Sequence, residues 1–318
     1  MTQDLSYVKD LHYFTPARVS TIIAAYNAER TIAETIDSAL AQRYEDHEIV
    51  VVNDGSTDST VAILEKYSNR IKVVTQPNRG AAAARNAGVA YSTGKYIALL
   101  DSDDLWLTEK LRTMVAALER KPHASLAFSE YAKIDEHGAE FGESLIGHAP
   151  SMAEMMRSPL RILTSTLVIP RRMFDLSGGF NEEFKGQGFE DWWLLLLLRE
   201  IGEFEYVPDK LTRYRISDDD ERADKYGRGL STFIALVKKR YRAQGKNAIK
   251  NLQCRWLLSK VAHQMDRGDR LGALISLMQI GRIRPSYFFG SEFTDRLRLP
   301  HNLKRVRDLT TVRSSLAR

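Results

Sequence analysis

The stretch Tyr96-Ile97-Ala98-Leu99-Leu100-Asp101-Ser102-Asp103-Asp104 is an apolar β-type run that ends in three carboxylates within four positions. This pattern predicts a buried strand that delivers acidic side chains to one edge of a sheet. Aspartate is depleted in strands, and carboxylates buried together repel one another and lose solvation, so the cluster needs a compensating cation. A hard divalent ion with oxygen ligands is the simplest compensation. In the alternative interpretation, Asp103 or Asp104 only caps a following helix.

Length and composition restrict the class of protein. The 318 residues are enough for one large domain, or for a domain of about 200–250 residues with an appendage. The single cysteine, Cys254, excludes a disulfide framework and a thiolate metal site. Residues 1–18 lack the apolar segment of a signal peptide, and the longest apolar runs, 192–198 and 271–280, are too short to span a bilayer. We therefore expect a cytoplasmic protein without a transmembrane anchor.

Charge is distributed unevenly along the chain. Residues 228–318 contain 20 Lys and Arg against 5 Asp and Glu, whereas the rest contains 26 against 36. Three segments of this basic part, at 230–242, 248–265 and 270–280, have the apolar spacing of helices. The combination predicts peripheral contact with an anionic membrane or, alternatively, helices that pack together and expose a solvated basic face. We expect no nucleic-acid partner.

Strand and helix patterns alternate four times in the first 122 residues. Apolar or β-branched runs at 19–24, 47–53, 71–75 and 96–100 are each followed, after a short connection, by a segment with helical spacing. This alternation predicts an α/β fold with a doubly wound, mostly parallel sheet that binds ligands at the carboxyl ends of its strands. The chain contains neither Gly-x-Gly-x-x-Gly after the first strand nor a P-loop, which disfavours dinucleotide oxidoreductases and P-loop NTPases.

Polar loops follow three of these strands, at 25–27, 53–58 and 101–104. Because the carboxyl ends of parallel strands lie at the same edge of a sheet, we expect the three loops to line one crevice.

The alternation loosens in the second half of the chain, where strands are predicted at 125–134 and 165–170. A loop with four glycines, 178–189, then leads to Glu190-Asp191 at the start of a further predicted helix. Two carboxylates at a helix N-terminus complement the helix dipole, which is one interpretation of this pair. Their position after a glycine-rich loop that can open and close favours a functional one.

Five sequence blocks together resemble family 2 of the glycosyltransferases, whose members have the GT-A fold. The resemblance covers about the first 220 residues and is specific because the blocks occur in the order and at the spacing of the family. The blocks are Ile23-Ala24-Ala25-Tyr26-Asn27, residues 51–58 (Val-Val-Asn-Asp-Gly-Ser-Thr-Asp), Asn78-Arg79-Gly80 with Ala84-Arg85-Asn86-Ala87-Gly88, Leu100–Asp104, and Gly178-Gly179-Phe180 leading to Glu190-Asp191-Trp192.

The resemblance implies a GT-A catalytic domain for nucleotide-diphospho-sugars, and with it a division of the chain. We expect an irregular segment at 1–17, a catalytic domain at 18–225 and a basic helical C-terminal extension at 226–318. The catalytic domain is expected to consist of a nucleotide-binding half, 18–122, and an acceptor half, 123–225.

The family's nucleotide site maps onto two of the loops and one helix. By resemblance, Ala24, Ala25, Tyr26 and Asp54 would hold the nucleobase, and the carboxylate of Asp54 would accept a hydrogen bond from an imide N–H. Arg85 would lie near the nucleotide, where a guanidinium suits phosphate or base recognition. The alternative for Arg85 is an exposed residue on an alanine-rich helix.

The third loop, 101–104, would bind the ribose and the metal ion in the expected site. Asp101 and Ser102 would belong to the nucleotide site, with Asp101 facing the ribose, and Asp103 would bind a Mn²⁺ or Mg²⁺ ion that bridges the donor diphosphate. The family often has a metal-site His after a Tyr-Arg pair, but here Tyr214-Arg215 precedes Ile216-Ser217 and then Asp218–Asp220. Either an aspartate substitutes, the metal keeps an extra water, or the metal site is weaker; a solvated acidic loop is the alternative for this run.

The resemblance also implies a mechanism. An acceptor hydroxyl attacks the anomeric carbon of the sugar while a nucleoside diphosphate leaves, and a carboxylate takes the hydroxyl proton. We expect Asp191 to be this base, with Glu190 as the second candidate. A single displacement inverts the anomeric configuration.

The function implied is that of a metal-dependent, inverting, hexosyltransferase-type enzyme. It would transfer a sugar from a nucleotide sugar, a UDP-sugar above all, to a saccharide or lipid-linked saccharide in cell-surface polysaccharide or glycoconjugate synthesis, in the cytoplasm or peripherally on the cytoplasmic face of the membrane. A sugar nucleotidyltransferase is disfavoured by the Glu190-Asp191 block and the lack of a glycine- and lysine-rich triphosphate loop. A catalytically silent nucleotide-sugar-binding or membrane scaffold protein is the alternative that the missing His and the basic tail suggest.

Overall fold

The structure, a computed structural model, describes residues 18–157, 162–185, 187–216, 222–242, 245–266 and 268–286. These residues form two compact units. The first contains the described residues of 1–149, 162–180 and 201–217, and the second those of 150–161, 181–200 and 218–318. The predicted division of the chain at residue 225 stays a prediction.

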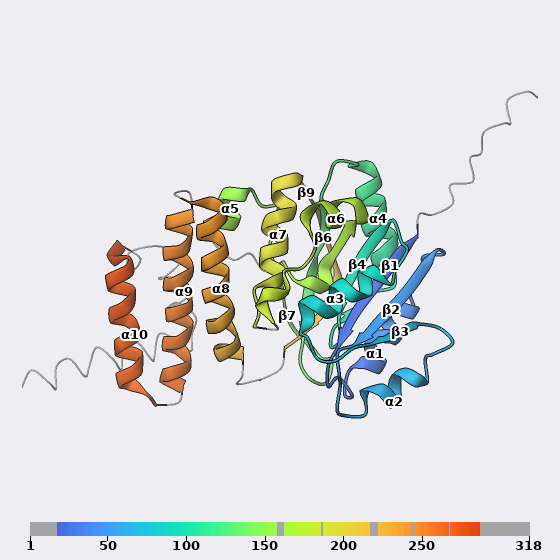
Figure 1. The fold of residues 1–318 in the computed structure, drawn as a ribbon, viewed down its shortest axis with the longest axis horizontal. Coiled ribbons are helices and arrows are strands. Elements are labelled where there is room, and N and C mark those ends of the chain that lie inside the picture. The colour runs from blue at the N-terminus through green and yellow to red at the C-terminus, as the bar shows by residue number, and fades with distance from the viewer. Residues whose placement is uncertain are drawn as a thin grey trace, which may run out of the picture. The chain divides into compact units, whose positions relative to one another are not determined.

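A single mixed sheet forms the centre of the first unit (Figure 1). Its strand order is β3-β2-β1-β4-β8-β6-β9-β5, and β7 pairs with β6 beside this path. The strands β3, β2, β1 and β4 are mutually parallel and β6 is parallel to β9, whereas β8, β7 and β5 run antiparallel to their neighbours. The strands are β1 (Val19–Ala25), β2 (His47–Asn53), β3 (Lys72–Thr75), β4 (Tyr96–Asp101), β5 (Leu105–Trp106), β6 (Leu126–Ile134), β7 (Glu140–Glu143), β8 (Leu167–Pro170) and β9 (Phe204–Arg215).

The predicted α/β class and mostly parallel sheet are confirmed. Strands β1 and β4 lie at the centre because their side chains are mostly apolar and mostly buried on both faces, which is typical of parallel strands covered by helices. Close packing requires Gly88 on the helix that follows β3, since a Cβ there would lie 2.5 Å from the Ile22 side chain of β1. The helices of this unit are α1 (Ile32–Leu40), α2 (Thr60–Glu65), α3 (Ala81–Ala90), α4 (Lys110–Arg120) and α6 (Arg171–Ser177).

The register of the parallel strands confirms that three loops begin at one edge of the sheet. Ala25 at the end of β1 is paired with Asn53 at the end of β2, and Ala24 is paired with Asp101 at the end of β4. The three strands therefore stop at the same level, and the loops at 25–27, 53–58 and 101–104 leave side by side.

Two parts of the sheet differ from the sequence-based expectation. Strand β8 begins at Leu167 rather than at 165, because Thr164–Thr166 forms a 3-10 turn. The twelve residues of β9 were not predicted as a strand, since they contain Pro208 and several charged side chains. Strand β9 pairs along the whole length of β6 and ends at Arg215, next to Ile134.

The second unit is helical and contains α5 (Met152–Arg157), most of α7 (Glu190–Ile201), α8 (Arg222–Tyr241), α9 (Gly245–Asp266) and α10 (Arg270–Ile283). The last three agree with the helices predicted in the basic part of the chain. Helices α9 and α10 pack through a small core that contains the buried Cys254, Leu257 and Ile280. Among the helices described, none has the length and apolar character needed to cross a membrane.

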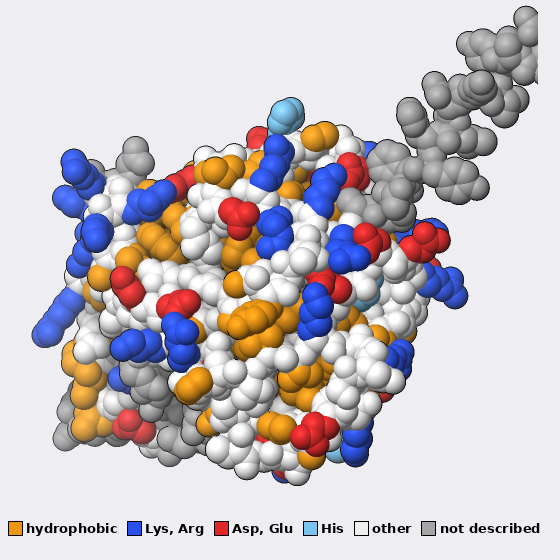
Figure 2. All heavy atoms as spheres, turned by 45° about the vertical axis from the view of Figure 1, so that its right-hand side comes forward, with side chains coloured by type: hydrophobic (Ala, Val, Ile, Leu, Met, Phe, Trp, Pro, Cys, Tyr) orange, Lys and Arg blue, Asp and Glu red, His pale blue; other side chains and the backbone are white. Residues whose placement is uncertain are grey.

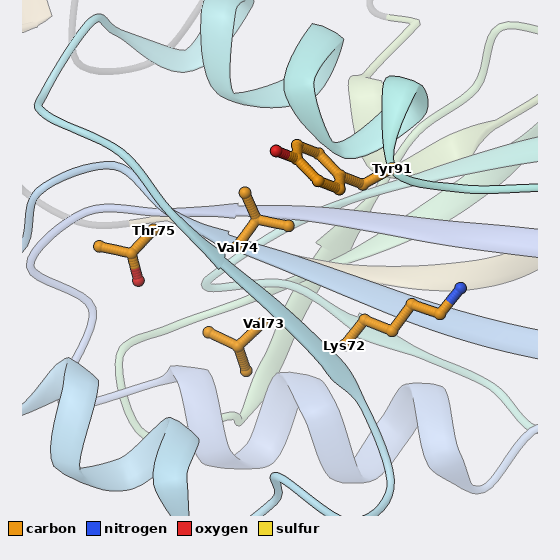
Figure 3. A pocket seen from close by; sticks show the side chains of 5 residues that line it. All are labelled: Lys72, Val73, Val74, Thr75 and Tyr91. Atoms are coloured by element: carbon orange, nitrogen blue, oxygen red, sulfur yellow. The ribbon is translucent and has the colours of Figure 1, made fainter.

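A shallow hollow of about 430 Å³ lies at the open edge of the sheet, where β3 has a single neighbour. Figure 3 shows Val74 of β3 pointing toward the Tyr91 ring at the end of α3, with Lys72, Val73 and Thr75 around them. None of the predicted site residues lines this hollow.

Helix α4 begins with a lysine that is fully buried. The ammonium nitrogen of Lys110 donates to the Thr166 carbonyl oxygen at 3.1 Å and lies 5.4 Å from the centre of the Trp106 ring. Burial lowers the pKa of Lys110 from 10.5 to about 7. The fold therefore favours the neutral form of this lysine, whereas the unfolded chain favours the charged form.

This difference in pKa predicts a pH-dependent stability. Because the unfolded state binds the extra proton between pH 7 and 10.5, the contribution of Lys110 to the free energy of unfolding is complete above pH 10.5 and lost as pH falls toward 7. Relative to Lys110→Met, the wild type should gain stability by up to about 5 kcal/mol over this range. Urea unfolding at several pH values measures it. Lys66→Met, at an exposed lysine, is the control, and equal pH profiles of wild type and Lys110→Met would contradict the prediction.

Candidate active site

The end of β4 is built around a buried aspartate. The two carboxylate oxygens of Asp104 accept hydrogen bonds from the Ser165 hydroxyl and from the backbone N–H of Arg215, at 2.5 and 2.9 Å. Burial, followed by the charges of Asp103 and Asp101, raises the pKa of Asp104 well above its ordinary value. Asp104 thus belongs to the interior below the loop, and it does not act as the helix cap of the alternative interpretation.

Arg215, the last residue of β9, holds the same loop from the other side. Its buried guanidinium donates to the carbonyl oxygens of Asp103 at 2.9 Å and of Glu136 at 2.8 Å, and it pairs with the Glu34 carboxylate of α1 at 2.9 Å. A guanidinium has five donors in a fixed plane, so one side chain fixes several acceptors at once. Arg215 therefore sets the position of the backbone at Asp103.

Asp101 faces an arginine from α3. A guanidinium nitrogen of Arg85 lies 2.7 Å from a carboxylate oxygen of Asp101, and the guanidinium carbon lies 5.2 Å from the centre of the Phe180 ring. Only 7% of Arg85 is exposed, so the alternative of an exposed helix residue is wrong. The positive charge of Arg85 compensates one of the three clustered carboxylates.

The residue after Arg85 attaches the start of the glycine-rich loop to α3. The Asn86 side chain donates to the Phe180 carbonyl oxygen at 2.9 Å and accepts from the Phe180 N–H at 3.0 Å. Gly179 suits this contact because its φ of 72° is easy for glycine and a Cβ there would lie 3.0 Å from the Asn86 oxygen. Two of the blocks that resemble the family are therefore physically joined.

The loop after β1 presents a short polar surface. Ala24 is partly exposed and Ala25 is buried, whereas Tyr26 is half exposed. Asn27 adopts a left-handed backbone with φ of 48°, and its side-chain oxygen accepts from the Thr57 N–H at 2.8 Å. This contact ties the loop after β1 to the loop after β2.

Asp54 secures the loop after β2 to the segment before α3. Its N–H donates to the Ala25 carbonyl oxygen at 2.8 Å. Its carboxylate accepts from the Gln76 side chain at 2.7 Å and from the N–H groups of Arg79 and Gly80 at 2.9 and 2.8 Å. Only 3% of Asp54 is exposed, and these three bonds fix the orientation of its carboxylate.

Ser102 and Asp103 complete the loop after β4. The Ser102 carbonyl oxygen accepts from the hydroxyl groups of Thr31 at 2.8 Å and Thr35 at 3.0 Å, so the start of α1 fixes this residue through its backbone. Both Ser102 and Asp103 are partly exposed. Their side chains are thus accessible while their backbone is held by α1 and β9.

The two remaining predicted residues begin α7 in the second unit. Only 8% of Glu190 is exposed, whereas Asp191 is partly exposed and accepts from the Trp192 N–H at 2.7 Å. Phe189 precedes them with a φ of 72°, which bulky residues rarely adopt. The helix start is therefore held in an uncommon backbone conformation.

Helix α8 supports this conformation. The buried Phe233 contacts the rings of Phe189, Trp192 and Trp193 at centre-to-centre distances of 5.4, 6.4 and 6.1 Å. Gly229, one turn earlier, lies so close to the backbone of 187–188 that a Cβ would be 2.4 Å from two carbonyl oxygens. The backbone that leads to Glu190 therefore packs directly against α8.

The structure brings eight of the ten predicted site residues together in the first unit, namely Ala24, Ala25, Tyr26, Asp54, Arg85, Asp101, Ser102 and Asp103. Glu190 and Asp191 are described with the second unit, and Asp218–Asp220 lie outside the described residues. Sequence reasoning did not find the roles of Arg215, Asn86 or Gln76. The sequence signal at Arg215 is the Tyr214-Arg215 pair, which precedes the position where the family often has a metal-site His.

The sequence profile described as "Glycosyl transferase family 2" matches residues 20–179. The chain belongs to glycosyl transferase family 2. The matched range contains every predicted residue of the first unit, so the family resemblance is confirmed. The roles of the individual residues stay predictions.

Two relatives and one solved structure show the extent of the similarity. The chondroitin synthase of Pasteurella multocida is 30% identical over 226 residues, which are 69% of this chain and 22% of that protein. The Escherichia coli protein WfgD, named UDP-Glc:alpha-D-GlcNAc-diphosphoundecaprenol beta-1,3-glucosyltransferase, is 40% identical over 121 residues, 37% of this chain and 47% of that protein. The chain therefore spans less than half the length of these two family 2 relatives.

The structure of S. aureus TarS 1–349 in complex with UDP-GlcNAc matches with a TM-score of 0.55 and 16% identity. The match covers 85% of this chain and 91% of that one. At this identity the likeness concerns the fold alone, and it confirms the GT-A fold of this family 2 chain.

The end of β4 in this family 2 chain is suited to a divalent cation. The partly exposed Asp101 and Asp103 are hard oxygen donors, and both contribute to the raised pKa of Asp104, which shows how concentrated the negative charge is. Within the part of the chain that the structure describes, no three His, Cys, Asp or Glu side chains are arranged to hold a metal. Mg²⁺ commonly uses one or two carboxylates plus substrate phosphates, so a two-carboxylate set fits it.

The contacts of Arg215 predict a large structural effect of its loss. Arg215→Met keeps the apolar stem but leaves several buried carbonyl oxygens without a donor, so the free energy of unfolding should fall by about 3 kcal/mol. Chemical denaturation measures this change. Arg213→Met is the matched control, because its ion pair with Glu140 is exposed and should contribute less than about 1 kcal/mol. Equal losses in both variants would contradict the prediction.

Proposed function

We propose that this chain is a glycosyltransferase that moves a hexose from a UDP-sugar to an acceptor hydroxyl with inversion of the anomeric configuration. The observation that carries the proposal is the common level of β1, β2 and β4, whose ends place Ala24, Asp54 and Asp101 at one edge of the sheet. A doubly wound sheet binds its ligands at this edge.

The nucleobase would bind at the ends of β1 and β2. Tyr26 is half exposed and Ala24 has no bulky side chain, which leaves a flat surface for a planar ring. The Asp54 carboxylate, held in place by three hydrogen bonds, would accept a further one from the single imide N–H that uracil has. Asp101 would accept from the ribose, and Ser102 would lie beside it.

The names of related proteins support this choice of donor and acceptor. WfgD is named for transfer of glucose from UDP-Glc, with a beta linkage, to a GlcNAc-diphosphoundecaprenol. TarS has been crystallised with UDP-GlcNAc. We propose for this chain a UDP-hexose donor and a saccharide or lipid-linked saccharide acceptor, in cell-surface polysaccharide or glycoconjugate synthesis, with the enzyme acting peripherally on a membrane.

We propose that Asp103, with Asp101 beside it, holds a Mn²⁺ or Mg²⁺ ion. When bound, the ion neutralises charge on the departing diphosphate. Arg85 keeps one Asp101 oxygen in place through its ion pair, and Arg215 keeps the Asp103 backbone in place through its carbonyl oxygen. Arg85 thus orients the Asp101 carboxylate, and Arg215 positions the Asp103 backbone, in advance of ligand binding.

We propose Asp191 as the base that removes the acceptor proton. Its carboxylate is partly exposed, whereas Glu190 is almost entirely buried, so an acceptor hydroxyl can reach Asp191 more readily. The hydrogen bond from the Trp192 N–H orients one oxygen of the Asp191 carboxylate.

Binding of UDP tests the donor site. Calorimetric titration with Mn²⁺ should show binding that weakens by roughly tenfold or more with EDTA, or in Asp103→Ala, because the diphosphate loses its compensating charge. Asp175→Ala changes an exposed aspartate of α6 in the same unit and should bind as the wild type does. An Asp103→Ala variant with undiminished Mn²⁺-dependent binding would exclude the proposed metal role. Failure of the wild type to bind UDP, with binding of GDP or dTDP, would exclude the proposed nucleotide.

Transfer kinetics test the base. Asp191→Asn should lower kcat by about 10²–10⁴-fold and leave UDP affinity near the wild-type value, because a general base contributes to the chemical step and not to donor binding. Glu190→Gln, the adjacent matched change, should have a smaller effect on kcat. NMR of the product should show a β-glycoside from an α-linked donor. Full activity of Asp191→Asn, or an α-linked product, would refute this part of the mechanism.

A further inference from the structure

Helix α10 has a continuous apolar face that no described part of the chain covers. Leu271, Leu274, Ile275 and Met278 are 69, 47, 44 and 53% exposed. Their spacing of three, one and three residues puts all four on one side of the helix. Other large apolar side chains that are exposed occur singly or in pairs along the sequence, so this face is the longest of its kind among the described residues.

The opposite side of α10 is also apolar and already has a partner. Ala273, Ser276 and Ile280 are buried, and Ile280 joins Cys254, Leu257 and Leu258 of α9 in one core. Figure 1 shows α9 and α10 side by side along their length. A helix that is apolar on all sides normally has apolar surroundings on all sides, and α9 supplies them on one side only.

The charges around the exposed face are almost all positive. Helix α10 contains no Asp or Glu, and the exposed Arg270 and Arg282 flank the apolar face near its two ends. Residues 245–284 contain eight Lys and Arg against two Asp and Glu. Figure 2 shows that Lys and Arg side chains stand beside hydrophobic ones on the surface of the protein.

This charge pattern favours an anionic membrane surface over a second copy of the chain as the partner of α10. Pairing of two α10 faces from two copies of the chain would bring arginines near arginines, with no acidic residue on the helix to compensate them. An anionic membrane surface is complementary to both features, because the apolar side chains enter the boundary between headgroups and acyl chains while the arginines meet lipid phosphates.

We propose that the face of α10 formed by Leu271, Leu274, Ile275 and Met278, with Arg270 and Arg282, docks on an anionic lipid surface. This inference rests on the proposed function in one respect, since it identifies the part of the chain that makes the peripheral membrane contact. Docking through α10 would hold the enzyme at the surface where a lipid-linked acceptor presents its saccharide.

Vesicle binding tests the surface. The full chain is sedimented with phosphatidylcholine vesicles that contain or lack phosphatidylglycerol, at low and at high salt. The variant Leu271→Gln/Leu274→Gln/Met278→Gln changes only exposed side chains and should lower partitioning to the phosphatidylglycerol vesicles by about tenfold or more. The variant Arg270→Gln/Arg282→Gln should lower it by several fold and reduce its salt dependence.

The matched control is Leu145→Gln/Leu176→Gln, which makes the same kind of change at two exposed leucines outside α10 and should bind vesicles as the wild type does. Equal partitioning of the wild type and the triple α10 variant would overturn the proposal, and so would equal binding to vesicles with and without phosphatidylglycerol. A wild-type dimer that becomes monomeric in the triple variant, measured by sedimentation without lipid, would assign the face to a second copy instead.

UDP titration of the same preparations separates this inference from the proposed function. The triple α10 variant should bind UDP with wild-type affinity, because none of its changed residues belongs to the donor site. Vesicle binding without UDP binding in the wild type would refute the proposed function and leave the docking surface standing. UDP binding without vesicle binding in the wild type would refute the docking surface and leave the proposed function standing.

Discussion

Compensation of negative charge at the end of β4 is the constraint on which the rest of the first unit depends. Three carboxylates within four residues repel one another, and burial of Asp104 adds to the unfavourable energy. Arg85, on a helix packed over the parallel strands, compensates Asp101 with its positive charge. Arg215, at the end of a strand near the far side of the sheet, donates its N–H to Asp104 and holds the backbone of Asp103 through its guanidinium. The strand order that brings β9 to this position, and the close packing of α3 on β1 at Gly88, are conditions for these contacts.

The second unit also contains an unfavourable feature, an uncommon backbone conformation, which is stabilised by packing and not by charge. The backbone at Phe189 is in a region that an aromatic residue rarely occupies, and such a conformation persists only when its surroundings determine it. Two residues of α8 supply those surroundings. The ring of Phe233 packs against the ring of Phe189, and Gly229 lets the backbone of α8 lie directly against the backbone of 187–188. The basic helical part of the chain is therefore integral to the local structure around Glu190 and Asp191.

The sequence predicted the elements whose signal is local. The apolar runs of β1, β2 and β4, and the polar residues directly after them, revealed the parallel half of the sheet and eight residues of the candidate site. Strand β9 was missed because its partner β6 lies some 80 residues earlier and pairing at that distance leaves no periodic pattern in a strand with a proline and many charges. The role of Arg215 and the contact between Asn86 and Phe180 could not be predicted for the same reason. Their partners are far away in the sequence and are brought close only by the topology of the fold.

The ion pair between Arg215 and Glu34 joins positions 181 residues apart. A ribosome makes the chain from its N-terminus, so β1, α1 and β4 emerge long before the arginine that fixes Asp103. Until residue 215 has left the ribosome, the Asp104 carboxylate and the Asp103 carbonyl oxygen lack the donors that Arg215 supplies, and a loop of this length must close before these contacts form. The long-range closure by β9 therefore makes completion of the structure around the end of β4 a late event in folding.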